Sequence, residues 1–484
     1  MLPVALLLPF AGSALLFCLR LKRRAARNLL SFLFTLAASV CAGAAVLSPQ
    51  GGAFTLAVFT DRLSIAFRMD GLARVFTGLI AFLWPLSTLY AYEYMRHEGQ
   101  ENVFFGFYLL SYGVTLAIAT AANLFTLYIF YELLTFSTLF LVAHGLSARA
   151  VAAGRKYLYY SLGGAALAFV AMIGALHYGG TTAFQYGGIR QIGQAPQATV
   201  LVLFTLGFLG FGVKAAIFPL HGWLPTATVA PTPVTALLHA VAVVKAGVFA
   251  VARLTFFVYG VEVVSGTWAQ TACLCVALFT ILFGSTMAVR EQHVKRRLAY
   301  STVSNLSYVL FGILLMTPAG LTAGLMHMVF HALIKIALFS CVGAWMIRTG
   351  KEYVQDLRGM GKRMPFTFVV FAFCSVELVG IPPFIGFQSK WALATAGLAG
   401  GTVFGLIGAG VLILSAILTA VYLLAPAVTA FALPPNEDMA SVTNDDPGWQ
   451  MKLPLAVLCV VMLALAFASG PLIGFLSRVA NGIM

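Results

Sequence analysis

Nine ionisable side chains lie within apolar stretches that are long enough to cross a lipid bilayer. They are Glu132, Lys214, His239, Lys245, His327, His331, Lys335, Glu377 and Lys390. Placing a charge at the centre of a bilayer costs roughly 2.5–3.5 kcal/mol on insertion scales. Ionisable groups kept at such a cost usually pair with one another or mark a path for ions or protons. These nine residues are therefore candidates for proton transfer.

Three of the nine share one helix face. His327, His331 and Lys335 in HMVFHALIK are spaced i, i+4 and i+8, so each lies about one helical turn from the next. Histidine titrates near pH 6.5, at about the pH of the cell, and it both donates and accepts hydrogen bonds, which suits proton hopping through intervening water. Two histidines at i and i+4 can also share a metal ion, but no nearby carboxylate or thiolate set completes such a site. The spacing favours a proton relay.

Glu132 lies in the middle of its apolar stretch, LYIFYELLTFS, too far from either end to reach water. It needs a cationic partner, and either Lys214 or Lys245 supplies one. Burial disfavours the charged ammonium, whereas a nearby carboxylate favours it, and a lysine balanced between these effects can exchange its proton. The alternative for Glu132 is a static salt bridge that fixes helix packing. His239 is a further possible member of the relay.

Prolines follow or precede two of the buried lysines. Lys214 is followed by Pro219, and Lys390 is preceded by Pro382 and Pro383. Proline removes a backbone donor and breaks a helix, which frees carbonyl groups that can hold water or an ion where protein lines a cavity. Pairs of interrupted helices are typical of transporters with a site at the membrane midplane. We therefore expect helix breaks at all three prolines.

Two residues near the second break keep open alternatives. Lys390 lies nearer a helix end, so its ammonium either joins the relay or extends to the membrane surface. Glu377 is either a partner for Lys390, an additional protonatable site, or a protonated and hydrogen-bonded acid.

The elements that hold these residues are membrane-spanning helices. The chain has 484 residues, of which 61% are hydrophobic and 9% charged, whereas soluble domains carry about 25% charged residues. Apolar runs of about 20 residues predict an all-α polytopic membrane protein. The fourteen predicted spans are 2–19, 29–47, 71–92, 103–121, 123–143, 156–177, 198–219, 232–257, 267–288, 298–316, 320–346, 366–395, 402–427 and 452–475.

The net charge of +14 is a topology signal rather than a nucleic-acid surface. In the fourteen-span arrangement, 19 of the 29 lysines and arginines fall in loops on one side, six fall on the other side and four lie inside spans. By the positive-inside rule the rich side is cytoplasmic. We therefore expect a multi-pass protein of the cell inner (plasma) membrane with both termini on the outer side. Arg253 and Arg62 are interpreted as boundary charges.

Two loops are longer than the rest. Residues 51–71 alternate apolar and polar side chains and predict a small external β-hairpin. Residues 434–450 are polar and predict a surface loop on the inner side. The seven cysteines form no CxxC pair or ladder of iron–sulfur ligands, and no nucleotide-binding loop is present. We expect no cofactor and no metal in this chain.

Four long motifs resemble one known family. They are KAAIFPLHGWLPTATVAPTPVTALLHAVAVVKAGVFAVAR (214–253), KRRLAYSTVSNLSYVLFGI (295–313), HMVFHALIKIALF (327–339) and GIPPFIGFQSKW (380–391). The family comprises the antiporter-like membrane subunits of respiratory complex I, Mrp-type cation/proton antiporters and energy-converting membrane hydrogenases. The resemblance covers about residues 70–430 and is greatest to the subunit 5 type, without that type's lateral helix.

The resemblance implies fourteen helices with two inverted five-helix repeats, in which helices seven and twelve are broken. One transmembrane domain then comprises N-terminal helices and hairpin (1–102), a first repeat (103–257), a second repeat (267–427) and a polar loop with the last helix (428–484). It also implies roles for the relay residues. Glu132 resembles the fifth-helix glutamate, Lys214 its seventh-helix partner, and Lys245 the central eighth-helix lysine. The eleventh-helix relay and the twelfth-helix exit lysine are matched by His327, His331, Lys335 and Lys390.

Glu377 is a departure from the family pattern, and so are Thr228 and Asn305, which stand where relatives often have other residues. The leading hypothesis is a proton-translocating subunit of a redox-driven complex, of the complex I or membrane hydrogenase type. Its iron–sulfur or metal centres would lie in partner subunits. Alternatives are a subunit of an Mrp-type antiporter without redox chemistry, in which sodium could also move, and a non-conducting membrane scaffold. No nucleic acid is expected as a partner.

Overall fold

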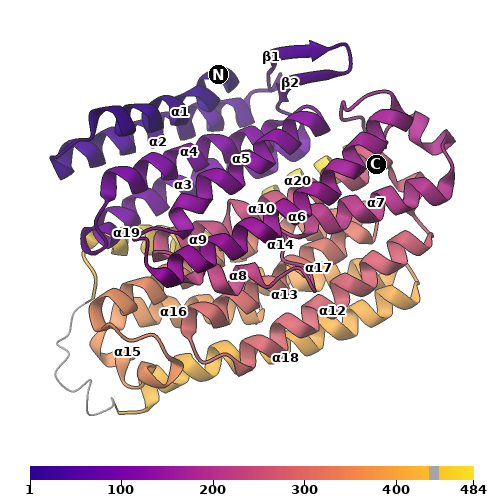
Figure 1. Cartoon of the computed structure of the whole chain (residues 1–484). Coiled ribbons are helices and arrows are strands. Elements are labelled where there is room, and N and C mark those ends of the chain that lie inside the picture. The colour runs from indigo at the N-terminus through magenta and orange to yellow at the C-terminus, as the bar shows by residue number, and fades with distance from the viewer. Residues whose placement is uncertain (435–445) are drawn as a thin grey trace.

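Long helices make up nearly the whole molecule, because backbone polar groups inside a bilayer must be satisfied within the segment that carries them. A computed structural model describes residues 1–434 and 446–484. The helices lie side by side with their axes roughly parallel or antiparallel (Figure 1). The predicted all-α membrane fold is confirmed.

The helices of the first half precede residue 265, and those of the second half follow it. The first are α1 (Leu2–Leu19), α2 (Arg24–Leu47), α3 (Gly71–Tyr94), α4 (Glu101–Thr120), α5 (Leu124–Val142), α6 (Ala148–Gly179), α7 (Gln197–Gly212), α8 (Trp223–Thr226), α9 (Thr232–Ala240), α10 (Val243–Arg253), the π-helix η4 (Leu254–Tyr259) and α11 (Val261–Val264). The second are α12 (Trp268–Arg290), α13 (Val294–Leu314), α14 (Pro318–Thr349), α15 (Met360–Arg363), α16 (Pro365–Val379), α17 (Ile385–Ala399), α18 (Val403–Ala432), α19 (Trp449–Ala468) and α20 (Gly470–Ile483).

Within the described ranges, eleven helical segments are long and apolar enough to cross a membrane. Two shorter apolar helices, α7 and α16, end at interruptions. The third predicted span outside the eleven is α13, whose Ser, Thr and Asn side chains lower its hydropathy. The multi-pass architecture is confirmed, and the number of fourteen spans stays a prediction. The last predicted span, 452–475, is wrong in its extent, since α19 ends at Ala468 and α20 begins at Gly470.

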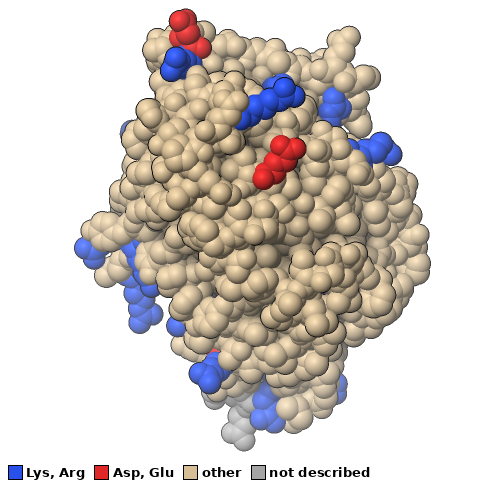
Figure 2. Space-filling view, turned by 90° about the vertical axis from the view of Figure 1, so that its right-hand side faces the viewer, with Lys and Arg blue, Asp and Glu red and all other residues tan. Residues whose placement is uncertain are grey.

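One end of the bundle, here named the hairpin end, carries both termini. The antiparallel strands β1 (Ala53–Thr60) and β2 (Leu63–Arg68) confirm the hairpin predicted at 51–71. The N–H of Gly187 donates to the carbonyl of Ile483 at 3.2 Å, which ties the C-terminal helix to a neighbouring loop. Figure 2 faces this end, where isolated charged side chains lie on an otherwise uncharged surface.

The opposite end, named the basic end, carries most of the lysines and arginines. It comprises the α1–α2 loop and the connections α3–α4, α5–α6, α12–α13 and α14–α16. The inner polar loop predicted at 434–450 falls for the most part on residues 435–445, which lie outside the described residues.

The core of the bundle is formed by α14, which is buried along almost its whole length. It packs against α9, α13, α16 and α17. The segment from α9 to η4 is fully buried as well. These two segments carry most of the predicted relay residues, so the fold places them in the interior of the molecule.

Candidate functional site

The first proline break lies directly after α7, as predicted. The helix ends at Gly212, and Lys214 follows in an irregular stretch that contains Pro219. Side chains satisfy the backbone groups that the break frees, since the indole N–H of Trp223 donates to the carbonyl of Val213 at 2.8 Å. The break therefore lets the side chain of Lys214 point into the protein interior, while a carbonyl at the end of α7 keeps a hydrogen-bond partner.

Lys214 is fully buried against Tyr131 of α5. Its ammonium donates to the carbonyl of Tyr131 and lies 3.5 Å from the centre of that ring. The neighbouring Glu132 is half-buried, and its Oε1 atom has no hydrogen-bond partner in the described part of the chain. The direct ion pair expected for Glu132 is absent from these ranges, because Lys214 points to the carbonyl and ring of the preceding residue. The two charges still interact electrostatically.

Lys245 lies at the centre of a second group of residues. Its ammonium is 2.6 Å from Nδ1 of His331, which joins α10 to α14, and both side chains are fully buried. The other ring nitrogen of His331, Nε2, has no partner among the described residues. A buried imidazole with one free nitrogen is available to exchange a proton with water or with a neighbour.

His327 lies one turn along α14, with its ring centre 5.9 Å from that of His331. Its Nδ1 contacts the hydroxyl of Ser389 on α17 at 2.9 Å, and its Nε2 contacts Oδ1 of Asn305 on α13 at 3.2 Å. The structure thus brings His327 and His331 onto one face of α14 and connects them to both neighbouring helices.

Lys335 continues the same face towards the basic end. Its buried ammonium donates to the carbonyl of Leu298 at 3.0 Å and lies within electrostatic reach of Lys245 and Lys390. All three predicted members of the α14 stripe therefore belong to one buried group.

The second proline break separates α16 from α17 at Pro382 and Pro383, as predicted. The buried ammonium of Lys390 donates to the carbonyls of Leu378 and Val379 at 2.6 and 3.0 Å. These are end carbonyls of α16, where the helix dipole favours a cation. Lys390 thus points into the bundle, and the alternative in which it extends to the membrane surface is wrong.

Glu377 bridges this break instead of pairing with Lys390. Its Oε2 accepts a hydrogen bond from the N–H of Ile385 at 3.0 Å, at the start of α17. Its Oε1 is buried and has no partner in the described ranges. Gly386 is required nearby, because a Cβ there would overlap the carbonyl of Glu377. The alternative in which Glu377 pairs with Lys390 is therefore wrong, and the alternatives in which it is a protonatable site or a protonated, hydrogen-bonded acid stay predictions.

A third break, which the sequence did not predict, interrupts the eighth span. Helix α9 ends at Ala240 and α10 begins at Val243, although neither proline nor glycine lies between them. His239 occupies the last turn before this break, with its ring 4.7 Å from that of Phe339. Both of its ring nitrogens are buried without a partner among the described residues, and Lys335 and Lys245 lie within electrostatic reach. His239 therefore belongs to the same group.

The two lysine sites meet through a close backbone contact. Gly247 of α10 packs against the backbone of Lys214 and Ala215, where a Cβ would overlap the amide of Ala215. Lys245 lies half a turn before this contact. The first break and the centre of the second group are thus held together at Gly247, without a hydrogen bond between Lys214 and Lys245 in the described part of the chain.

Sequence reasoning missed several members of the site. Tyr131 holds Lys214, and Asn305 and Ser389 hold His327. Sequence signals for them exist, since Tyr131 precedes Glu132 and Ser389 precedes Lys390. Asn305 lies within the motif at 295–313. Tyr308, whose ring centre lies 5.1 Å from that of His327, belongs to the same motif.

Arg253, interpreted as a boundary charge, lies level with the start of α3 but is not at the surface of the bundle. Arg253 is fully buried, and its guanidinium donates to both carboxylate oxygens of Asp70 at 2.7 and 2.8 Å. Because η4 continues the helix beyond Arg253, this residue lies inside the packed bundle instead of at its surface.

The arrangement has the chemistry of a proton path rather than of a metal site. The predicted path contains four buried lysines and three buried histidines, which are Lys214, Lys245, Lys335, Lys390, His239, His327 and His331. No group of three or more His, Cys, Asp or Glu residues in the described ranges could hold a metal ion. Lys245 and His331 are in direct contact, and each of these groups can accept and release a proton.

Comparisons with known proteins place the chain. Subunit N of NADH-quinone oxidoreductase from Desulforudis audaxviator is 34% identical over 361 residues, which cover 73% of this chain and 70% of the relative. The A/B component of a probable K⁺/H⁺ antiporter from Rhizobium meliloti is 33% identical over 403 residues, which cover 81% of this chain but only 39% of that protein. The chain thus spans less than half the length of the second relative.

A solved structure of the membrane-bound sulfane sulfur reductase, an archaeal respiratory membrane complex, contains a chain with the same fold. The TM-score is 0.88 at 22% identity, and the match covers 100% of this chain and 97% of that chain. Residues 121–419 match the family described as "NADH:quinone oxidoreductase/Mrp antiporter, TM". The resemblance found in the motifs is confirmed: the chain belongs to the NADH:quinone oxidoreductase/Mrp antiporter family of membrane subunits.

Proposed function

We propose that this chain translocates protons across a membrane as the antiporter-like subunit of a redox-driven complex of the complex I or membrane hydrogenase type. The observation that carries the proposal is the contact between Lys245 and His331 in the core of the bundle. Two titratable groups at hydrogen-bond distance, each beside further buried titratable groups, form the centre of a path on which a proton can move.

The proposed path runs from Glu132 and Lys214 to Lys245, enters the stripe of His327, His331 and Lys335 at His331, and leaves at Lys390. Glu132 and Lys214 act as the switch. When the ammonium of Lys214 moves towards the carboxylate, the pair holds its proton, and when it moves away, the proton passes on towards Lys245. His239, with two free ring nitrogens among the described residues, is a side member of the path. Moving one elementary charge across the membrane against a potential of 100 mV requires about 2.3 kcal/mol, so the path needs a source of energy.

The energy is supplied by partner subunits. This chain carries no redox centre in the proposal, and iron–sulfur or metal centres belong to other membrane and peripheral subunits of the complex. The protein lies in the plasma membrane with its basic end in the cytoplasm and both termini outside. Support comes from relatives and a structural neighbour that are parts of multi-subunit membrane complexes.

A second function is a subunit of a cation/proton antiporter without redox chemistry. The similarity to the K⁺/H⁺ antiporter component favours it, since that relative matches over the larger share of this chain. The same buried lysines would then couple proton movement to a cation gradient. A third possibility, a non-conducting scaffold, requires that the buried lysines have no role in transport.

The test uses the complex purified with its partner subunits and reconstituted into vesicles that enclose a pH-sensitive dye. We expect Lys245→Ala to lower proton translocation by about a hundredfold, the effect of removing one positioned acid–base group. Lys362→Ala removes an exposed lysine at the basic end and serves as the matched control. A native gel checks that each variant assembles with its partners.

The result also separates the three functions. Proton movement that follows the electron donor supports the redox-driven complex. Movement that follows an imposed sodium or potassium gradient, with no electron donor present, supports the antiporter. Unchanged translocation in an assembled Lys245→Ala complex would leave only the scaffold.

A further inference from the structure

A cavity of about 540 Å³ lies at the basic end of the bundle, away from the buried lysines. It opens where the end of α1 and the start of α2 meet the start of α4. Its lining combines apolar side chains with arginines, and consists of Leu16, Phe17, Arg20, Arg27, Gln100, Glu101, Asn102 and Val103.

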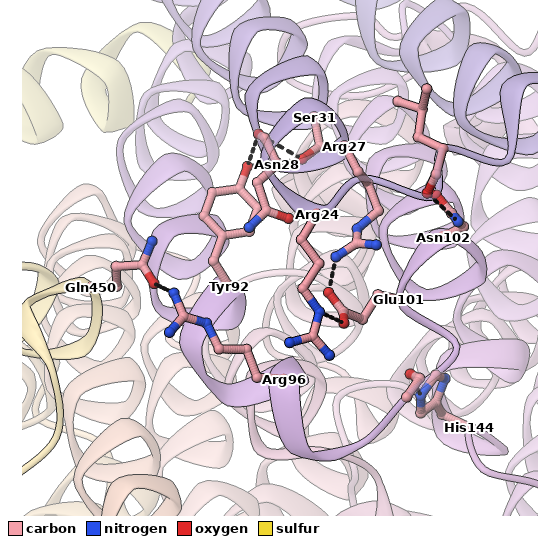
Figure 3. Close-up of polar contacts among 12 residues, drawn as sticks. Arg24, Arg27, Asn28, Ser31, Tyr92, Arg96, Glu101, Asn102, His144 and Gln450 are labelled. Carbon is pink, nitrogen blue, oxygen red and sulfur yellow. Dashed lines mark hydrogen bonds and ion pairs between the residues drawn. The ribbon is translucent and has the colours of Figure 1, made fainter.

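Positive charge predominates on the polar side of the cavity. The buried guanidinium of Arg27 and the half-exposed guanidinium of Arg24 both point to Glu101 (Figure 3). Arg24 uses only its Nε atom for this contact, at 2.8 Å. Arg20 lines the cavity and is exposed. The lining thus carries two arginines, Arg20 and Arg27, and one carboxylate, Glu101, with Arg24 beside that carboxylate, which leaves a surplus of positive charge for an anionic ligand.

Two buried polar atoms at the cavity lack partners. Nε of Arg27 and Oδ1 of Asn102 are both buried without a hydrogen-bond partner in the described ranges. Buried polar groups are nearly always satisfied in native proteins. The side chain of Arg27 is only 5% exposed and lines the cavity, so a ligand or bound water inside the cavity is the partner that fits it.

The other side of the cavity is apolar and continues along the bundle. Phe17 lies against Phe107 with ring centres 5.0 Å apart, and Phe107 stacks on Phe140 at 4.3 Å. Phe140 is 53% exposed, so this row of rings, here named the phenylalanine row, lies on the outer surface of α1, α4 and α5. An apolar surface beside a cluster of arginines fits a molecule with a charged head and an apolar tail.

We propose that this cavity binds an anionic phospholipid. The phosphate group lies at Arg20 and Arg27, and one acyl chain follows the phenylalanine row into the bilayer. Arginine suits phosphate because its planar guanidinium can donate two parallel hydrogen bonds. Basic pockets between membrane helices are recognised sites for anionic headgroups. A soluble anion would use the arginines but would have no use for the apolar flank.

The first experiment compares two residues of one loop. The complex is stripped of lipid in detergent, titrated with phosphatidylglycerol or phosphatidylcholine, and examined by native mass spectrometry. We expect phosphatidylglycerol to be retained in preference to phosphatidylcholine. Arg20→Gln should weaken phosphatidylglycerol binding about fivefold, the effect of one cation near an anionic headgroup. Lys22→Gln removes the same charge from the same loop outside the cavity and should change binding less than about twofold.

A second variant tests the cavity without changing charge. Val103 is 42% exposed at its rim, and Val103→Trp should fill the space and abolish retention of the lipid. Val40→Trp, at a residue 62% exposed on α2 and outside the lining, is the control for an added surface indole. Arg20 and Val103 are both at the surface, and thermal unfolding of each variant checks that the fold is retained.

Four results would overturn the proposal. Equal retention of the two lipids shows that the site does not select an anionic headgroup. An equal loss from Lys22→Gln and Arg20→Gln shows general attraction by the loop rather than binding in the cavity. The arginines can also be labelled with a guanidine-directed reagent in the presence of a competing ligand. If excess inorganic phosphate protects them from labelling and phosphatidylglycerol does not, the cavity binds a free anion. Failure of Val103→Trp to assemble, while Val40→Trp assembles, assigns the cavity to a partner subunit that covers it.

Discussion

Arg253 illustrates at the residue scale how a buried charge is held in this protein. Its guanidinium forms a double hydrogen bond with Asp70, and the rings of Phe184, Phe249 and Phe257 lie within 5.1 Å of it. Asp70 also accepts a hydrogen bond from the N–H of Ala73 and so caps α3. The pair therefore joins the start of α3 to the end of α10 just inside the hairpin end. Removing one partner would leave a buried charge without compensation.

Arg253→Met should lower the free energy of unfolding by about 3–5 kcal/mol, the usual cost of breaking a buried pair. Denaturant titration of the purified complex in detergent measures this loss. The double variant Asp70→Asn with Arg253→Met should recover part of it, because no lone carboxylate remains. Additive losses in the double variant would contradict a direct pair.

The same pair predicts a dependence on pH. Burial acts to raise the pKa of Asp70, but the charge and hydrogen bonds of Arg253 and the N–H of Ala73 outweigh it and hold that pKa below its ordinary value. The stabilisation is complete above the ordinary pKa of aspartate, about 3.9, and is lost as the pH falls through the lower folded value. The difference in stability between wild type and Asp70→Asn should accordingly persist at pH 5 and shrink only in stronger acid. A difference that vanished between pH 7 and pH 5 would exclude Asp70 as the group responsible.

At the scale of elements, the uninterrupted α14 packs against two interrupted helices, α9–α10 and α16–α17, and the third interrupted helix, α7, packs against α10. Each interruption places a lysine or histidine beside α14 or beside another break: Lys214 after α7, His239 at the end of α9 and Lys390 within α17. In a continuous helix, the 3.6-residue periodicity alone would set the face on which each of these side chains lies. An interruption frees their direction and adds helix-end carbonyls that bind an ammonium, as Leu378 and Val379 do for Lys390.

Gly247 offers a test of how closely the first break must approach α10. We expect Gly247→Ala to lower proton translocation by about a hundredfold. A Cβ at this position would overlap the backbone of Lys214 and Ala215 and displace Lys214 relative to Lys245. Small displacements of a reacting group lower the rate of a reaction strongly. Translocation is measured in the same reconstituted vesicles. Gly410→Ala in α18 is the control, since a Cβ there meets no atom within 4 Å. Equal activity of both variants would show that the spacing of the two lysine sites is unimportant.

Much of this arrangement was predictable from the sequence, and the remainder has identifiable causes. Pro219 and the pair Pro382–Pro383 predict their helix breaks, because proline interrupts the hydrogen bonding of a helix. The break between Ala240 and Val243 has no such residue, and it lies in a fully buried segment whose local sequence does not mark it. The spacing of His327 and His331 fixed their common face. Their partners Asn305 and Ser389 come from other helices, and no local pattern specifies that contact.

At the scale of the whole molecule, charge is distributed unevenly between the two ends. The helices alternate in direction, and the hydrogen bond from Gly187 to the carbonyl of Ile483 keeps the C-terminus near the hairpin. Most lysines and arginines lie at the other end, in the short connections where the positive-inside rule applies. The lipid cavity belongs to this basic end as well, so charge that orients the chain during insertion also serves binding in the folded protein.

Orientation in the cell follows from this asymmetry and can be measured directly. A basic loop resists translocation, so the basic end should remain in the cytoplasm and the hairpin end should face outward. Alkaline phosphatase fused after Met484 should be active, whereas a fluorescent protein fused there should stay dark. A fluorescent protein inserted at Lys351, in a loop of the basic end, should fluoresce and provides the internal control. Fluorescence at both positions would mean that the C-terminus lies on the same side as the basic loops. That result would contradict the fold, because the hydrogen bond between Gly187 and Ile483 holds the C-terminus at the hairpin end. It would also contradict the even number of predicted crossings, which places both termini on one side. Fluorescence only at Met484 would instead reverse the whole molecule, and with it the direction in which the path from Lys214 to Lys390 carries protons.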